Sequence, residues 1–413
     1  MNDTDLYRQI LGITVPWTIT RVVLDVEQVT VHVYLDFQTD DTPLLCPECG
    51  APAGRYDSRE ERSWRHLDSC QFQTFLVARV PRVQCPEHGV LTLEVPWSQP
   101  YSRFTLLFER FAIDVLRATT VQAKAAVLLR LTPAHVHELM ARAVDRGLAR
   151  RDREEALPHL TLDEKSYQHG HHYLTILGDA DAGRVLEVQD SRTQEATSTL
   201  LTTALSPAQR LRVASITMDM WKAFMNAATQ SVPFAEIVHD PFHIARDLNA
   251  AVDQTRRAEH RALTRRGDAT LTASKYLWLT GPERFTPAQR DRFEALRAQD
   301  LTTATVWSFK ETFRDFFHCR TASEAQLYFT MWHDAAVAQG QHALTKVAER
   351  LRTHLPGLLA FFRHRVTNAI AEQINSQIQY LKAAARGYRR FANFRVAILF
   401  FLGKLELYPQ TFP

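Results

Sequence analysis

Apolar and polar positions in the first third of the chain alternate with the period of β-strands. Residues 19–37 carry β-branched and aromatic residues in alternation on both sides of a central Glu-Gln pair, a pattern that predicts a hairpin. Residues 72–83 alternate in the same way and predict further strand structure. From residue 104 to about residue 150, apolar residues recur at spacings of three and four, which predicts helices.

The pattern changes after a charged segment at residues 150–158, which ends in proline and which we expect to be a linker. Short apolar runs then predict strands, and the stretches between them predict helices. The expected strands are residues 160–166, 172–180, 184–191, 215–220 and 235–240, and the expected helices are residues 195–205 and segments that start near Trp221 and Phe242. Three consecutive strands followed by strands that alternate with helices predict a mixed α/β sheet.

The remainder of the chain has a helical pattern. Residues 256–357 are rich in arginine and alanine and contain no convincing strand, and a last helix-rich segment starts near His364. With 413 residues, of which 45% are apolar and 23% are charged, the chain has material for several ordinary globular domains. Its 49 Lys and Arg residues nearly balance 46 Asp and Glu residues, so any nucleic-acid-binding surface must come from local clustering of cations.

The chain shows no sign of secretion or of a membrane span. Its amino terminus has no basic stretch followed by an apolar one, and the apolar run at residues 396–403 is too short to cross a bilayer. We therefore expect a cytoplasmic protein without a membrane partner, in which the five cysteines are thiols or metal ligands rather than disulfides.

Two short turns carry ligands suited to zinc. The sequences Cys-Pro-Glu-Cys-Gly and Cys-Pro-Glu-His-Gly each place two sulfur or nitrogen ligands two residues apart, and a tetrahedral zinc ion needs four such ligands. The candidate ligands are Cys46, Cys49, Cys85 and His88. Because the protein fills all four positions, a zinc ion here would be structural, whereas the alternative is scattered cysteines without a role. We expect Cys70 and Cys319 to be buried small residues rather than ligands.

Residues 121–136 predict a helix, a short turn and a second helix. Thr132 is suited to cap the second helix, and Pro133 is suited to its first position. The expected core between the two helices consists of Val127, Leu128, Leu131, Val136 and Leu139, and the residues expected to face DNA are Arg130, His135, His137, Arg142 and Arg146. An ordinary amphipathic helical pair with a solvated basic face explains the pattern equally well, although the adjacent zinc turns favour DNA binding.

Two aspartates lie within apolar, strand-like runs. Asp163 follows Thr161 and Leu162, and Asp219 follows Thr217 and Met218. The ends of strands are where α/β folds place their chemistry, and a carboxylate in apolar surroundings is costly unless it is paired or bound to a metal. Either aspartate alone is explained by a turn or a helix cap, but the pair suggests a shared site.

A third acidic candidate lies on a predicted helix near residue 370. Asn368, Glu372 and Asn375 share one face, at spacings of four and three residues. The opposite face carries the apolar stripe Ile370, Ile374, Ile378 and Leu381. A plain polar face is the simpler interpretation of this pattern. Three carboxylates would together suit two Mg²⁺ or Mn²⁺ ions about 3.5–4 Å apart, the arrangement that promotes in-line displacement at a phosphodiester.

Taken together, these motifs resemble the DDE transposases of bacterial insertion sequences, specifically the ISL-type family. The motifs that carry the resemblance are the two zinc turns, the predicted helix-turn-helix, residues 162–166, 218–221 and 240–243, the block around Glu372, residues 386–395 and residues 407–409. The family pattern has a glycine after the glutamate, where this chain has Gln373. The resemblance covers nearly the whole chain.

The resemblance implies a ribonuclease-H-like core with Asp163 on the first strand, Asp219 on the fourth and Glu372 on a late helix. It also implies that Asp240 and His243, together with Asn368 and Asn375, support this site. We expect a multidomain α+β protein with five parts. These parts are a zinc-ribbon-like domain at residues 1–98, a helix-turn-helix domain at 99–156, the first part of the core at 157–255, an all-helical insertion at 256–357 and the second part of the core at 358–413.

The function implied is DNA transposition. A homodimer would bind the terminal inverted repeats of an insertion sequence as double-stranded DNA, hydrolyse phosphodiester bonds with two metal ions, and join the freed 3′-OH to target DNA. Such a protein is expected to be bacterial and associated with the nucleoid. One alternative is a non-enzymatic zinc and helix-turn-helix regulator derived from a transposase. Another is a ribonuclease-H-like nuclease such as a junction resolvase, which the separate DNA-reading modules disfavour.

Overall fold

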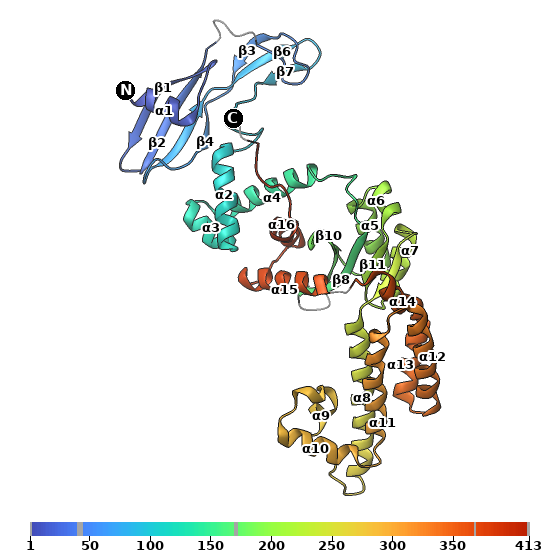
Figure 1. Ribbon diagram of the computed structural model, residues 1–413. Helices are drawn as coiled ribbons and strands as arrows, with labels where there is room; N and C mark the ends of the chain where they lie inside the picture. Colours follow the sequence, from blue (N-terminus) through green and yellow to red (C-terminus); the bar gives the residue numbers. More distant parts are fainter. Residues whose placement is uncertain (1, 39–43, 169–171, 367–368, 411–413) are drawn as a thin grey trace. The chain divides into compact units, whose positions relative to one another are not determined.

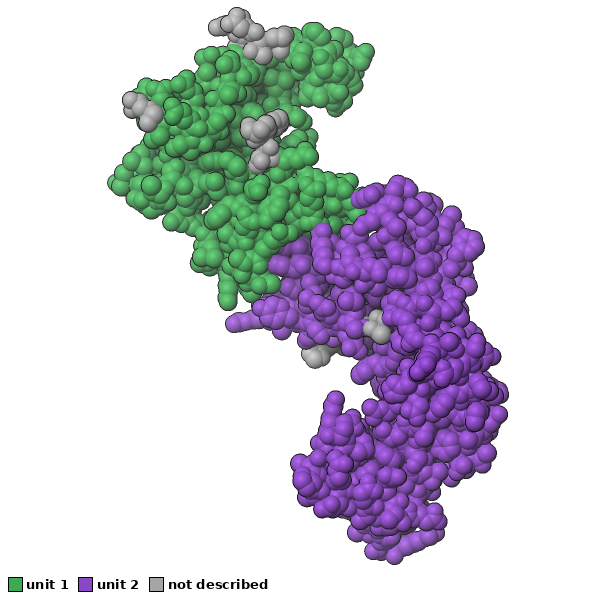
Figure 2. All heavy atoms as spheres, in the orientation of Figure 1, with its two compact units in different colours: residues 1–151, 405–413 green, residues 152–404 purple. Residues whose placement is uncertain are grey.

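The computed structural model describes residues 2–38, 44–168, 172–366 and 369–410, and Figure 1 labels its helices and strands. The chain divides into two compact units (Figure 2). The first unit combines Met1–Arg151 with the segment from Leu405 onward, and the second unit is Asp152–Lys404. Both helices and sheets are present, which confirms the predicted mixed α+β class. Among the described helices, none is long and apolar enough to cross a membrane.

The first unit begins with a short helix and a four-stranded sheet. Its elements are α1 (Asp3–Leu11), β1 (Trp17–Asp25), β2 (Thr30–Phe37), β4 (Arg62–Arg65) and β5 (Gln73–Ala78). Strands β1 and β2 pair antiparallel, which confirms the predicted hairpin, and the strand order is β1-β2-β5-β4. The inward side chains of alternate positions build a core that includes Val33, Trp64 and Leu76. Helix α1 was not apparent in the sequence pattern.

A second, smaller sheet carries the zinc turns. It consists of β3 (Gly54–Ser58), β6 (Pro81–Cys85) and β7 (Gly89–Thr92), paired antiparallel in the order β3-β6-β7. The second zinc turn is the connection between β6 and β7, and its Gly89 adopts a left-handed φ of 68°. Gly50 closes the first turn with the same φ of 68°, and its amide donates to the Cys46 carbonyl at 2.9 Å. Glycine adopts this conformation without steric cost.

Three helices complete the first unit, namely α2 (Leu106–Thr119), α3 (Gln122–Leu129) and α4 (Pro133–Ala149). Thr132 caps α4 by accepting from the His135 amide, with Pro133 at the first position, as the sequence predicts. The predicted inter-helix core is partly wrong, because Val127 and Leu128 are 77% and 65% exposed. Helix α3 instead buries Ala125, Ala126 and Leu129. Small side chains on that face allow α3 to approach its neighbours closely.

The segment after residue 404 packs against α2 and α4. Leu407 is fully buried, and its carbonyl accepts from Arg146 Nη1 at 2.6 Å. The Tyr408 hydroxyl donates to Asp114 at 2.6 Å. A Cβ atom on Gly147 would lie 2.6 Å from the Leu405 Cβ, so glycine is the residue that permits this contact. Residues 405–408 are therefore part of the packing of the first unit.

His66 is a buried histidine in the first unit, and it provides a test of this packing. Its Nδ1 lies 2.9 Å from the hydroxyl of Thr105, the residue that caps α2. Burial, and then the charge of Arg65, lower the pKa of His66 to about 4. The folded state thus binds the His66 proton less tightly than the unfolded state does. The contribution of neutral His66 to the free energy of unfolding is therefore fully present above the ordinary pKa of 6.5, and it falls as the pH drops toward 4.

We expect the His66→Gln variant to lose less stability than the wild-type protein on acidification. Between pH 7 and pH 5 the free energy of unfolding of the wild type should fall by about 2 kcal/mol more than that of the variant. This corresponds to about 1.4 kcal/mol for each pH unit below 6.5. Urea unfolding at both pH values measures this difference. His318→Gln, at an exposed position, is the matched control. Equal losses in wild type and His66→Gln would show that another group titrates.

The second unit contains one five-stranded mixed sheet. Its strands are β8 (His159–Gln168), β9 (His172–Asp179), β10 (Arg184–Asp190), β11 (Ser215–Met218) and β12 (Glu236–His239). Their order is β10-β9-β8-β11-β12, with β8, β9 and β10 antiparallel and β8, β11 and β12 parallel. This arrangement confirms the mixed sheet that the apolar runs predict.

Helices cover both faces of this sheet. Helices α5 (Gln194–Ala204), α6 (Pro207–Arg212) and α7 (Lys222–Ser231) are followed much later by α15 (Ala369–Ala384) and α16 (Phe391–Leu402). Leu162 packs in a cluster with Leu200 of α5 and Phe224 of α7. The next residue, Asp163, accepts a hydrogen bond from Asn375 of α15. Because neighbouring strand residues point to opposite faces, α5 and α7 lie on one face of β8 and α15 lies on the other.

Between β12 and α15, the described residues form helices and no strand, as the sequence pattern predicts (Figure 1). The helices are α8 (Pro241–Thr264), α9 (Lys275–Leu279), η1 (Pro282–Arg284), α10 (Pro287–Arg297), α11 (Thr302–Thr312), η2 (Phe313–His318), α12 (Ala322–Ala338), α13 (His342–Thr353) and α14 (Leu355–His364). They share an apolar core of their own, which includes Trp278, Phe293 and Phe316. Glu259 of α8 caps α11 by accepting from the amides of Thr302 and Thr303 at 2.7 and 2.8 Å.

Candidate active site and metal centre

Three aspartates lie side by side at the carboxyl edge of the parallel strands. In the strand register, Met218 of β11 pairs with Leu162 of β8 and with His239 of β12. Each of these three residues is followed by an aspartate, namely Asp163, Asp219 and Asp240. Neighbouring strands lie about 4.8 Å apart, so the three carboxylates start from adjacent positions in one row.

Asp163 is held on two sides. Its Oδ1 accepts from the Glu164 amide at 2.7 Å, and its Oδ2 accepts from Asn375 Nδ2 at 2.6 Å. Burial raises the pKa of Asp163 to about 6; the Glu164 amide opposes this shift, and the negative charge of Asp219 adds to it. Hydrogen bonds thus orient the Asp163 side chain, and burial destabilises its ionised form. A nearby cation would stabilise that ionised form most strongly in such a setting.

Asp219 is held by His243. The His243 Nε2 lies 2.6 Å from Asp219 Oδ1 and 3.9 Å from Asp240 Oδ2. Burial acts to lower the pKa of His243, but the contact with Asp219 outweighs it, and the pKa is raised. Asp240 caps α8 by accepting from the Phe242 amide at 3.1 Å. This cap places His243 in the first turn of α8, where it faces the row of aspartates.

Glu372 and Asn375 lie near the start of α15, on the Asp163 side of the sheet. Glu372 is exposed, and its charge helps to raise the pKa of Asp240, after the larger effect of burial. Gln373, which replaces the glycine of the family pattern, is also exposed. Its side chain is therefore longer than that of glycine without being packed into the site. The predicted supporting residue Asn368 lies outside the described residues.

Three buried oxygen atoms around the acids accept no hydrogen bond among the described residues, namely Asn375 Oδ1, Asp240 Oδ2 and Asp219 Oδ1, and the last of these lies 2.6 Å from His243 Nε2 in an ion pair. Buried oxygen atoms without donors, beside ionisable carboxylates, form the kind of donor set that hard divalent cations take. The acids are spread more widely than the zinc turns, however. Within the described chain, one group of at least three Cys, His, Asp or Glu residues brings its ligand atoms within 4.8 Å of one another, and it does not include the acids.

That compact group is Cys46, Cys49, Cys85 and His88, the four residues that the sequence predicts as zinc ligands. The Cys49 and Cys85 sulfurs lie 3.8 Å apart, and His88 Nδ1 lies 3.6 Å from Cys85 Sγ and 3.8 Å from Cys46 Sγ. These separations match the edges of a tetrahedron around zinc, for which metal–ligand bonds are about 2.0–2.3 Å.

The surroundings of these ligands favour metal binding. A backbone hydrogen bond from His88, followed by the bond with its ring, lowers the pKa of the Cys85 thiol to about 6. Glu48 Oε2 lies 3.6 Å from His88 Nε2, on the ring nitrogen that faces away from the sulfurs. Such a carboxylate fixes the orientation of a histidine ligand. Of the other two cysteines, Cys319 is buried as predicted. The predicted burial of Cys70 is wrong, because Cys70 lies exposed in a turn before β5, although it lies outside the compact ligand group, as expected.

The residues predicted to face DNA have different environments. Arg146 is buried, and its Nη2 lies 2.5 Å from Glu109 Oε2. Arg142 lies 3.4 Å from the other oxygen of Glu109, which is itself buried. A buried, paired guanidinium is not presented to a phosphate, so Arg146 stabilises the helical packing instead.

The remaining predicted DNA-facing residues lie closer to the surface. Arg130, which ends α3 in a left-handed conformation, donates from Nη1 to the Gln71 carbonyl at 2.8 Å, and its side chain is 46% exposed. His135 and His137 on α4 are half-buried. The sequence placed all five residues on one helical pair, but it did not reveal Glu109, the buried partner that draws two of them inward.

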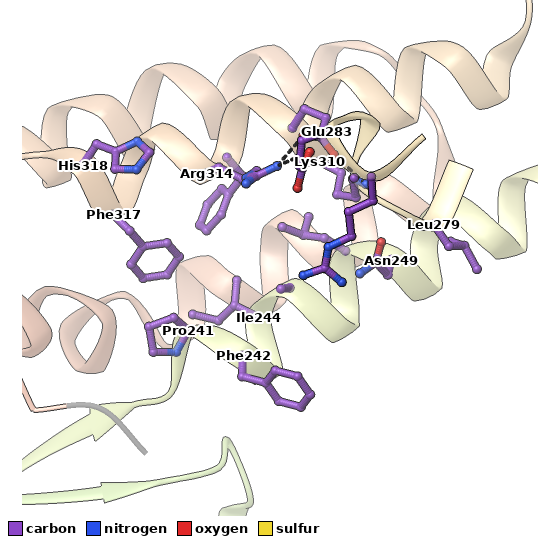
Figure 3. Close-up of a pocket in the computed structure, with 16 residues that line it drawn as sticks. Pro241, Phe242, Ile244, Asn249, Leu279, Glu283, Lys310, Arg314, Phe317 and His318 are labelled. Atoms are coloured by element: carbon purple, nitrogen blue, oxygen red, sulfur yellow. Dashed lines mark hydrogen bonds and ion pairs between the residues drawn. The ribbon is translucent and has the colours of Figure 1, made fainter. Parts of the chain in front are cut away.

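A cleft of about 520 Å³ opens beside the first turns of α8 (Figure 3). Pro241 and Phe242 lie on its α8 side, and Arg314 and His318 lie on the opposite wall. Its cations are largely matched by acids, because Arg314 pairs with Glu311 at 3.0 Å. The lining includes none of the predicted catalytic acids, although its Pro241 directly follows Asp240 in the chain.

Comparisons with known proteins decide the family. The family model described as transposase, of the ISL3 DDE type, matches residues 160–398, which is more than half of the chain. This chain belongs to the ISL3 family of transposases. A second model, the zinc finger of the transposases of IS204, IS1001, IS1096 and IS1165, matches residues 42–88, the segment that holds both zinc turns.

Two relatives extend the likeness over most of this transposase. The transposase for insertion sequence element IS1001 of Bordetella parapertussis is 26% identical over 350 residues, which cover 84% of this chain and 86% of the relative. The transposase for insertion sequence element IS1557 of Mycobacterium tuberculosis is 26% identical over 409 residues, which cover 89% of this chain and 91% of the relative. The predicted family is therefore confirmed, and with it a role in DNA transposition.

Proposed function

We propose that this transposase cuts and joins DNA at a two-metal site formed by Asp163, Asp219 and Glu372. The observation that carries the proposal is the strand register, which sets Asp163 and Asp219 in adjacent positions at one edge of the sheet. Helix α15 supplies Glu372 from the same side as Asn375, whose amide contacts Asp163. The order β10-β9-β8-β11-β12 fits the ribonuclease-H-like core that the resemblance implies, and this fit supports the proposal.

The protein's own side chains orient the ligands. Asn375 fixes one oxygen of Asp163, and His243 fixes one oxygen of Asp219. Asp240, in the same row, adds negative charge, and its buried Oδ2 accepts no hydrogen bond among the described residues, so it could bind a cation. Two Mg²⁺ or Mn²⁺ ions, when bound, would activate the attacking oxygen and stabilise the leaving 3′ oxygen. Carboxylate and amide oxygens bind hard cations such as Mg²⁺ and Mn²⁺, whereas zinc prefers nitrogen and sulfur ligands.

DNA recognition is proposed to lie in the first unit. Zinc at Cys46, Cys49, Cys85 and His88 would hold the small sheet together, and α3 and α4 would act as a helix-turn-helix on the terminal inverted repeats. Of the predicted contacts, Arg130, His135 and His137 keep a surface position, and Arg142 and Arg146 act through packing with Glu109. The domain boundaries given above complete the proposal, with residues 256–357 as the helical insertion.

A strand-cleavage assay tests the proposed function. The full-length protein would be mixed with duplex DNA that carries the terminal inverted repeats of its own element and the flanking sequence, with Mg²⁺ or Mn²⁺. We expect nicks at the element ends and joining of the freed 3′ ends to target DNA, most readily as a dimer that pairs two ends. Binding to the ends without cleavage in either metal would instead support the regulator, which the family comparisons do not favour.

A further inference from the structure

Three side chains form a stack at the same edge of the sheet as the aspartates, and we name them the Trp221 stack. They are Tyr173 of β9, Arg192 after β10 and Trp221 before α7. The Arg192 Cζ lies 3.9 Å from the centre of the Tyr173 ring and 5.2 Å from that of the Trp221 ring. Trp221 remains 45% exposed even with this arginine over its ring.

The stack is attached directly to the row of aspartates. Trp221 lies two residues after Asp219, and its amide donates to the Asp219 carbonyl at 2.7 Å. This tight turn keeps Trp221 next to Asp219. Arg192 Nη1 contacts both oxygens of Glu164 at 3.0 and 3.2 Å, and Glu164 directly follows Asp163. Because Glu164 and Asp163 point to opposite faces of β8, the stack lies on the α7 side and α15 on the other, with the carboxyl edge between them.

The backbone that aims Arg192 is strained. Ser191, directly before it, has a φ of 101°, in a region that residues other than glycine rarely adopt. The conformation is held by two contacts, because the Ser191 amide donates to the Tyr173 carbonyl at 2.8 Å and its carbonyl accepts from Thr175 Oγ1 at 2.7 Å. Strained residues that are held in this way concentrate at functional sites.

We propose that Trp221 and Arg192 form a binding site for one unpaired nucleotide of the DNA strand, beside the catalytic acids. An exposed indole stacks on the face of a base, and base faces are accessible where a strand is unpaired or ends. Arg192 uses Nη1 for Glu164, and its side chain is 36% exposed, so its other guanidinium N–H groups are available to donate to a phosphate. The site deepens the proposed function and rests on it, because strand cleavage creates such an end at this edge.

A fluorescent DNA probe tests the site without any chemistry. The probe is a duplex with a short single-stranded overhang that carries 2-aminopurine, mixed with the full-length protein in Ca²⁺. We expect binding to quench the probe, and we expect the overhang to bind about tenfold more tightly than a blunt duplex. Trp221→Ala should remove both effects, whereas Trp221→Phe should restore most of them. Arg192→Lys should retain more of the overhang preference than Arg192→Gln.

Phe234→Ala is the matched control, because Phe234 is a 71% exposed aromatic residue at the opposite end of β12 from Asp240. It should leave quenching and the overhang preference unchanged. Unchanged quenching in Trp221→Ala would overturn the proposal. So would equal losses of thermal stability and blunt-duplex binding in Trp221→Ala and Trp221→Phe, since these would mark a packing contact. Quenching by a wild-type protein that does not cut DNA would support the Trp221 stack and contradict the catalytic proposal alone.

Discussion

Asp163→Asn and Asp219→Asn are each expected to reduce strand cleavage and joining at least about a thousandfold, because each removes a negative oxygen ligand from a site that needs divalent cations. Glu372→Gln should have a similar effect. The variants should still fold, since burial already destabilises the Asp163 anion, asparagine has the same shape, and the Asn375 amide can turn so that its Oδ1 accepts from the new NH2 group. Rates of nicking and of strand joining on element-end DNA measure the loss, and a DNA-binding assay should show that affinity is retained.

Asp181→Asn is the matched control for these variants. Asp181 is an exposed acid in the turn between β9 and β10, and its own amide donates to Asp179. Its replacement should change the rate of cleavage by less than about twofold, as expected for a surface substitution away from the site. Full activity in Asp163→Asn, Asp219→Asn and Glu372→Gln would show that the chemistry lies elsewhere in the chain.

Loss of zinc is expected to unfold the small sheet of the first unit. Cys85→Ser removes one of four ligands, and Cys85 ends β6 directly before the turn to β7. Structural zinc sites contribute about 10–16 kcal/mol of apparent binding free energy in isolated zinc-finger peptides, so a sheet of three short strands should depend on the ion. We expect one zinc ion in each wild-type chain, and we expect Cys85→Ser to lose both the zinc and specific binding to the element ends.

Cys70→Ser is the natural comparison, because Cys70 is an exposed cysteine outside the compact ligand group. Metal analysis of the purified proteins, followed by thermal unfolding with and without a chelator, separates the two variants. The chelator should lower the melting temperature of the wild type and of Cys70→Ser, and it should leave Cys85→Ser unchanged. If Cys85→Ser retained its zinc, the proposed ligand set would be incorrect.

Much of the second unit was predictable, because its signals are local. The apolar runs that predict β8, β9, β10, β11 and β12 match the observed strands closely, since each run is buried and bounded by turn residues. Helix α6 was missed, although its Ser206 cap and Pro207 are typical start signals. The acids were predicted as a group partly from the family resemblance, and their catalytic roles stay a proposal. Their common register was not predictable, because strand pairing joins segments far apart in the chain.

By itself, the sequence determined the period of each element, the zinc turns and the cap of α4 by Thr132, because these depend on residues within a few positions of one another. The tertiary structure alone decided which side chains face inward. In that structure Arg146 is buried against Glu109, Val127 is exposed, and Leu407 packs in the first unit although it follows the second unit in the sequence. Each of these outcomes depends on a partner that is distant in sequence, and burial is a property of the assembled surfaces, which no local pattern contains.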